Sequence, residues 1–177
     1  FPEKPIVFLG VNSRALATAQ NQNPWVTGVI EDTSMAATID AAKALQSGLT
    51  TLTVITDSTP SGQADLQTLF YRQGQFADLP INVLDLTELS WESLTSTLEN
   101  LDETHAVLLL SAYVDMNNER RSFEEGLQLI IENSAAPVYH LWEHGIGEGL
   151  IGGVIISHRE QGAKAAELAK GVFQGES

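Results

Sequence analysis

The sequence predicts an α/β fold: a parallel sheet flanked by helices on both faces. Apolar, β-branched runs alternate with segments of helical patterning along most of the 177 residues. Strands separated by helices require right-handed crossovers, and these crossovers produce parallel sheets covered on both sides. The run over residues 104–111 is the most continuously apolar, which is typical of a central strand buried on both faces.

The first half of the chain predicts three extended segments and two helices. Asp32 or Thr33 can supply the N-cap of the first helix, and Gly48 is placed to end it. The expected elements are a buried strand over 5–11, an extended segment over 26–31, a helix over 34–46, a strand over 51–56 and a helix over 61–75.

The second half predicts further strand and helix pairs. Ser90 is a helix N-cap, and Ser122 with Glu125 and Ser157 with Glu160 have the spacing of two capping boxes. The expected elements are a strand over 81–86, a helix over 90–100, strands over 104–111, 136–141 and 149–157, and helices over 122–133 and 160–173, with a loop over 113–121.

Composition excludes several partners. The chain has 9 Lys and Arg against 23 Asp and Glu, a formal net charge of −14, so it repels phosphate backbones and nucleic acid is not an expected partner. The absence of cysteine excludes disulfides, thiol nucleophiles and zinc-thiolate sites but does not fix the compartment. The longest apolar runs are far shorter than the roughly 20 residues of a membrane helix. Because Phe1 is followed almost at once by an apolar strand, we expect further sequence to precede it.

Three catalytic or cofactor motifs match by spacing but not by context. His140 and His144 fit H-x-x-E-H, yet a zinc site of that type needs a helix, and here a strand leads into glycines. The G-x-G-x-x-G match over 147–152 enters a strand rather than a helix. A phospho-acceptor receiver needs its aspartate on the third strand and a lysine after the last, and neither is present. No G-x-S-x-G elbow or triad spacing appears. We therefore expect no catalytic residue, no metal ligand and no cofactor, although a triad assembled in space stays open.

Small polar and aromatic residues follow four of the predicted strands. In parallel sheets, ligands bind outside the carboxyl ends of the strands, where loops and helix amino ends converge. Singly, each residue can equally be a helix cap or a side chain that closes the sheet. Together they predict a small-molecule cleft. The candidate ligand-binding residues are Asn12, Ser13, Asp57, Ser58, Thr59, Ser61, Ser111, Tyr113, Trp142 and Glu143.

The order and spacing of these segments resemble the periplasmic-binding-protein-like sensor regions of bacterial membrane histidine kinases and diguanylate cyclases. The same pattern is similar to substrate-binding proteins of ABC importers. The resemblance covers nearly the whole chain, although each motif alone is weak. It is carried by PIVFLGVN (5–12), VTGVIED (26–32), DSTPSG (57–62), AVLLLS (106–111), PVYHLW (137–142), GGVIIS (152–157) and EQGAKAAELA (160–169).

The resemblance implies two α/β lobes with ligand held between them. It implies that residues 33–141 form the second lobe, that 1–11 and 152–177 belong to a first lobe, and that most of that first lobe lies outside the chain. It further implies a non-catalytic, extracytoplasmic region that senses a small molecule, with a possible homodimer and membrane attachment through segments outside these residues. The alternative is the binding component of an importer. The ending over 172–176 resembles sensor regions that run into a membrane segment, which favours the sensor.

Overall fold

A computed structural model describes residues 4–175, and chain contacts divide it into two compact units. Unit 1 comprises the residues up to Thr33 together with those from Ile156 onward, and unit 2 is Ser34–Ile155. The sequence analysis expected residues 1–11 and 152–177 in the first lobe and residues 33–141 in the second. In the structure, residues 12–33 pack with the first strand and residues 142–155 pack with unit 2.

Unit 2 contains a four-stranded, fully parallel sheet, which confirms the predicted α/β class. Its strands run in the order β4-β3-β5-β6. Each begins within two residues of its expected position. Their bounds are β3 Thr51–Thr56, β4 Ile81–Asp85, β5 His105–Leu109 and β6 Val138–His140.

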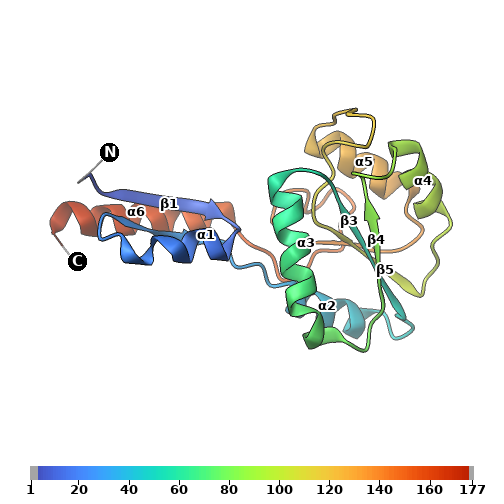
Figure 1. The fold of residues 1–177 in the computed structure, drawn as a ribbon. Helices are drawn as coiled ribbons and strands as arrows, with labels where there is room; N and C mark the ends of the chain where they lie inside the picture. The colour runs from blue at the N-terminus through green and yellow to red at the C-terminus, as the bar shows by residue number, and fades with distance from the viewer. Residues whose placement is uncertain (1–3, 176–177) are drawn as a thin grey trace. The chain divides into compact units, whose positions relative to one another are not determined.

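Helices cover both faces of this sheet, as the crossovers require (Figure 1). The helices α4 and α5 pack together on one face, and α2 and α3 lie on the other. Their bounds are α2 Met35–Leu45, α3 Pro60–Arg72 followed by the 3-10 turn η2 Gln73–Phe76, α4 Trp91–Glu99 and α5 Phe123–Asn133. Leu94, Leu98 and Ile130 of the α4 and α5 face are fully buried against Ile55 and Val107. Each such leucine or isoleucine stabilises the fold by roughly 1.5–3 kcal/mol relative to an exposed one.

The predicted caps hold at three of four helices. Ser90 and Ser122 accept hydrogen bonds from the N–H groups three residues on, and the capping box of Ser122 with Glu125 is complete. Ser157 is the N-cap of the last helix. The expectation that Asp32 or Thr33 caps α2 is wrong: the N-cap is Ser34, and its side chain makes no capping hydrogen bond.

The expected strand over 149–157 does not form. This segment makes isolated bridges, such as Tyr139 with Gly152, and then turns. Gly149, Gly152 and Gly153 all have positive φ, a region that an extended strand does not visit. At Gly153 an added Cβ would lie 2.5 Å from the carbonyl oxygen of His140, so this glycine permits the close passage of two backbones.

Unit 1 contains a parallel strand pair and the long C-terminal helix. The strands β1 (Ile6–Val11) and β2 (Val26–Ile30) are connected through α1 (Arg14–Ala19) and the 3-10 turn η1 (Gln20–Gln22), and α6 (His158–Gln174) packs against both strands. The sequence did not predict α1. Gln161 ties the unit together, because its amide accepts from Gly10 N at 3.2 Å and donates to a Glu31 carboxylate oxygen at 3.0 Å.

The strand β1 is not the buried strand that was expected. Ile6 and Leu9 are 45% and 49% exposed, and within the described residues only β2 pairs with it. The apolar character of residues 5–11 therefore did not predict correctly that this strand is buried. Across residues 4–175, the helices fall short of the length and apolarity needed to span a bilayer.

Candidate functional site

The candidate site lies at the carboxyl ends of β3 and β5. The chain moves from β3 outward to β4, then returns to β5 and continues to β6, so the strand order reverses between β3 and β5. At such a reversal the two following loops diverge and leave a crevice outside the sheet, the usual place for a ligand in open α/β sheets. The segments that leave β3 and β5 here are residues 57–61 and 110–113.

Asp57 joins these two segments. It is fully buried, and one carboxylate oxygen accepts from Thr59 N at 3.0 Å, from the Thr59 hydroxyl, and from Ser111 Oγ at 2.7 Å. The other oxygen accepts from Tyr113 N at 2.6 Å. Hydrogen bonds to a charged acceptor are among the stronger ones in proteins. Asp57 therefore fixes Thr59, Ser111 and Tyr113 in one arrangement, and its own oxygens face inward rather than toward a ligand.

Thr59 also starts the helix α3. Its backbone is extended, its hydroxyl accepts from Gly62 N at 3.1 Å, and Pro60 follows in the first turn. Gly62 then passes so close to the cluster that an added Cβ would lie 2.7 Å from Asp57 Oδ1 and 2.8 Å from Ser111 Cβ. Only glycine permits this approach, and it brings the amino end of α3 against the end of β5.

The exposed groups of this cluster are Ser58, Ser61 and Tyr113. Ser58 and Ser61 flank the buried turn, and Tyr113 is 36% exposed, whereas Ser111 is 4% exposed. The arrangement therefore has two layers. The buried inner layer consists of Asp57, Ser111 and part of Thr59, and it holds the strand ends in place. The outer layer consists of the exposed hydroxyl groups of Ser58, Ser61 and Tyr113. Hydroxyls of this kind orient a small polar molecule by hydrogen bonds.

The loop after Tyr113 is held by a second buried carboxylate, Asp115. Burial raises the pKa of Asp115, but hydrogen bonds from the backbone N–H groups of Glu119, Trp91 and Asn117 outweigh it, and the pKa is lowered. The Trp91 indole donates to Glu119 O at 3.0 Å, and the Arg121 guanidinium lies 5.0 Å from the ring centroid. Tyr113 is thus carried by a loop that is fixed at both ends.

Raising the pH should destabilise unit 2 through Tyr113. Burial, then the charges of Asp57 and Glu124, raise the pKa of Tyr113 above its usual value of 10.0. The folded state therefore holds the phenol proton more tightly than the unfolded state, so its stability is full below pH 10 and falls as the pH rises above it. We expect Tyr113→Phe to reduce this alkaline loss in urea unfolding between pH 9 and 11.5. Tyr71→Phe, at a 90% exposed position, is the matched control and should leave the loss unchanged.

Trp142 and Glu143 follow the neighbouring strand β6 and belong to a different cluster. Trp142 is buried, Glu143 is half-buried, and the indole ring lies 5.1 Å from the ring of His140 and 6.3 Å from that of His144. Phe123 of α5 contacts His144 at 4.3 Å between centroids. The sequence analysis rejected a zinc site at the two histidines and left them as a pair at the end of a strand. The structure confirms that they share no helix, yet a turn brings their Nε2 atoms to 3.2 Å.

Asn12 and Ser13 lie in unit 1, directly after β1. Both are half-buried, and Ser13 is the N-cap of α1, where its hydroxyl accepts from Leu16 N at 3.4 Å. The cap accounts for the serine at this position. Of the ten candidate residues, four are therefore joined by hydrogen bonds around Asp57, two flank that turn, two follow β6 and two belong to unit 1.

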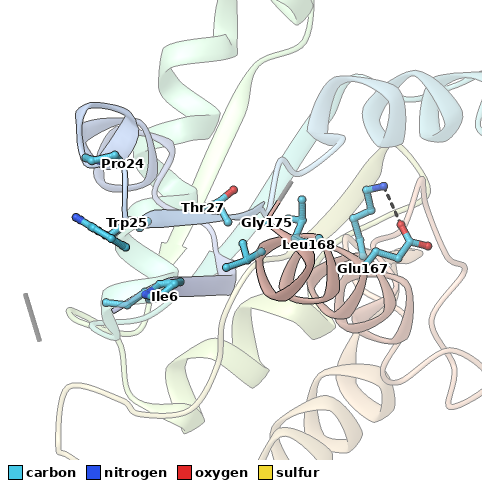
Figure 2. A pocket seen from close by; sticks show the side chains of 12 residues that line it. Ile6, Pro24, Trp25, Thr27, Glu167, Leu168 and Gly175 are labelled. Atoms are coloured by element: carbon cyan, nitrogen blue, oxygen red, sulfur yellow. Dashed lines mark hydrogen bonds and ion pairs between the residues drawn. The ribbon is translucent and has the colours of Figure 1, made fainter. Parts of the chain in front are cut away.

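Unit 1 has an apolar pocket of its own, of about 570 Å³ (Figure 2). Ile6, Trp25 and Thr27 form one wall, and Leu168 and Gly175 of the α6 end lie across from them. An ion pair between Lys164 and Glu167, at 2.9 Å, is among the groups that line it. The lining is mainly apolar and lacks the convergent hydroxyl groups found around Asp57.

Neither the cluster around Asp57 nor the cluster of His140, Trp142 and His144 resembles a metal centre. Among residues 4–175, no three His, Asp or Glu side chains come together in a way that could hold a metal ion. The groups present donate and accept hydrogen bonds. Sequence reasoning missed Gly62, Phe123 and Asp115, although the S-T-P-S-G context of Gly62 indicates a helix start.

Comparison with known proteins supports the fold only. No family model and no curated protein matches this chain. A solved structure that is similar to it is described as a conserved domain protein from Vibrio cholerae O1 biovar El Tor, with a TM-score of 0.67 and 14% sequence identity. The match covers 97% of this chain and 57% of the solved one, so the chain spans little more than half the length of that neighbour.

Proposed function

We propose that the chain is a small-molecule-binding region of a bacterial signalling protein. In this proposal it lies on the extracytoplasmic side of a membrane, and ligand binding is its input. The observation that carries the binding function is the hydrogen-bonded cluster of Asp57, Thr59, Ser111 and Tyr113 at the strand-order reversal. The assignment to a sensor rests on the sequence resemblance described above.

The proposed mechanism uses the two layers of the cluster. Asp57 is inaccessible and orients the outer hydroxyl groups, which meet the ligand without having to reorganise first. Ser58, Ser61 and the Tyr113 phenol are the groups that would contact the ligand directly. A ligand shifts the equilibrium between two conformations only by its different affinity for them, so these contacts must differ between the signalling states.

The test is a ligand panel followed by substitution of the outer hydroxyl groups. Thermal unfolding of the chain is measured with amino acids, carboxylates, sugars and nucleosides. A ligand at about 100 times its Kd adds roughly 2.7 kcal/mol, which is a readily measured shift. We expect Ser58→Ala and Tyr113→Phe each to weaken binding by about 5- to 10-fold through loss of one hydrogen bond.

Ser96→Ala, on the exposed face of α4, is the matched control and should bind as the original chain does. A ligand whose affinity is unchanged by both site substitutions would overturn the assignment of the site. Failure of the whole panel to stabilise the chain would count against a binding function for it.

A further inference from the structure

The negative charge of the chain is concentrated in unit 2. Of the 23 Asp and Glu residues, 17 lie in this unit, together with only 4 of the 9 Lys and Arg residues. The formal net charge of unit 2 is therefore −13, and that of unit 1 is −1. A net charge of this size creates a potential that attracts cations and repels anions. The hydrogen-bonded cluster around Asp57 lies in the strongly acidic unit.

The cationic side chains of unit 2 do not offset this charge at the cluster. Lys43 and Arg72 lie in the last turns of α2 and α3, at the opposite ends of the strands. Arg121 is paired with Glu119 at 2.8 Å. Arg120 is exposed and is the remaining guanidinium on the loop after β5. Within unit 2, an anion held by the outer hydroxyl groups would therefore have only Arg120 as a candidate partner.

The amino end of α3 is already occupied by a negative charge. The N–H groups at a helix start usually favour an anion. Here Thr59 N donates to the Asp57 carboxylate at 3.0 Å, and Gly62 N donates to the Thr59 hydroxyl at 3.1 Å. The Asp57 carboxylate thus takes the position that an anionic ligand would need. A second anion beside it would gain little from the helix and would be repelled by Asp57.

The electrostatic potential at the outer hydroxyl groups is negative, and Tyr113 senses it. Burial is the first cause that raises the pKa of its phenol, and the charges of Asp57 and Glu124 raise it further. Glu124 is exposed in the first turn of α5. Hydrogen bonds from its own backbone N–H and from Ser122 lower its pKa, so Glu124 is ionised at neutral pH. The Tyr113 hydroxyl is therefore close to two negative charges.

We propose that the ligand of the Asp57 cluster carries an ammonium group, which the negative potential of unit 2 selects over a neutral or an anionic group. The inference rests on the proposed function, because it names the ligand class of the same site. An ammonium has three N–H donors, and the hydroxyl oxygens of Ser58, Ser61 and Tyr113 accept them. The aromatic ring of Tyr113, which is 36% exposed, adds the attraction of a cation to a π-system. Asp57 is buried and acts through its charge rather than by contact.

The experiment compares three probes that share an unbranched alkyl chain and differ in the charge of the head group: n-butylamine, n-butanol and butyrate. Each is titrated into the chain at neutral pH while NMR follows the backbone amide signals. We expect n-butylamine to shift the amides of residues 58–61 and 113 and to bind at least about tenfold more tightly than n-butanol, whereas butyrate should not bind. Raising the salt concentration from about 20 mM to about 300 mM should reduce the advantage of the amine, because salt screens exposed charges.

Substitutions separate the local charge from the net charge. Glu124→Gln should weaken binding of n-butylamine by about 2- to 4-fold and leave n-butanol unchanged. Glu99→Gln, in the last turn of α4, makes the same change in net charge and is the matched control that should leave both unchanged. Tyr113→Phe keeps the aromatic ring, whereas Tyr113→Leu removes it, so Tyr113→Leu should cost the amine about a further 2- to 5-fold.

The outcomes distinguish this inference from the proposed function. Equal affinity for the amine and the alcohol, tighter binding of butyrate, or equal effects of Glu124→Gln and Glu99→Gln would overturn the selection of a cation. If n-butanol or butyrate shifts the same amides as strongly, the binding site stands and only the charge of its ligand is wrong. If none of the three probes shifts these amides, the inference is also wrong, and the ligand panel still decides the proposed function.

Discussion

Replacing Asp57 with alanine should cost unit 2 about 3–4 kcal/mol of unfolding free energy. The carboxylate is fully buried and accepts four hydrogen bonds that join the ends of β3 and β5. Its removal leaves the N–H groups of Thr59 and Tyr113 and two hydroxyls without their acceptor, and each buried unsatisfied donor costs about 1–3 kcal/mol. The four costs do not add fully, because the hydroxyls can rotate toward each other: Thr59 Oγ1 and Ser111 Oγ are 3.0 Å apart.

Two further variants make this result interpretable. Asp57→Asn keeps the shape of the side chain and one acceptor oxygen but places an amide NH2 opposite Tyr113 N. Its unfolding free energy should therefore lie between those of the original chain and of Asp57→Ala. Asp85→Ala is the matched control. Asp85 is the last residue of β4, but it is only half-buried and accepts from Thr87 N at 2.8 Å, so about 1 kcal/mol is expected. Urea unfolding measures all three, and an Asp57→Ala effect no larger than that of Asp85→Ala would refute the positioning role.

Replacing Gly62 with alanine should destabilise unit 2 by about 2 kcal/mol, although alanine is normally the better helix former by about 1 kcal/mol. The added Cβ would stand 2.7 Å from Asp57 Oδ1 and 2.8 Å from Ser111 Cβ, and the Asp57 carbonyl oxygen lies at 3.1 Å. Relief requires either that α3 move away from the end of β5 or that Asp57 release its donors. We therefore expect the variant also to weaken ligand binding, since both movements displace Ser58 and Ser61.

The control for Gly62 is a helical glycine with free space around it. At Gly162 in α6 an added Cβ has no atom within 4 Å, and alanine there should stabilise the chain by about 0.5–1 kcal/mol. Opposite signs for two identical substitutions would isolate the steric effect from helix propensity. If Gly62→Ala were stabilising as well, the close approach of α3 to Ser111 would be wrong.

Local sequence signals predicted the sheet of unit 2 and the helix starts. Apolar runs of four to eight residues between helical segments specify parallel strands, because each helix needs a sheet face to bury its apolar side chains. Ser90 and Ser122 were predictable as caps because the cap and its partner are three residues apart. Because the carboxyl ends of parallel strands lie at one edge of a sheet, the sequence also predicted that Asp57, Ser111 and Trp142 share that edge. The predictions failed where packing rather than local pattern decides: no strand forms over residues 149–157, and β1 forms close to its expected bounds but is not buried.

The roles within the candidate site were decided by contacts between distant parts of the chain. Asp57 meets Ser111 across 54 residues and Tyr113 N across 56, and only that packing turned the carboxylate inward and left the hydroxyl groups outside. His140 and His144 are near in sequence, but the turn between them depends on where α5 and β5 lie. The sequence by itself determined which residue types reach the edge of the sheet, since hydrophobic periodicity and capping act over a few residues. The tertiary structure decided which of them are buried and which remain accessible to a ligand, because burial depends on neighbours that no local pattern encodes.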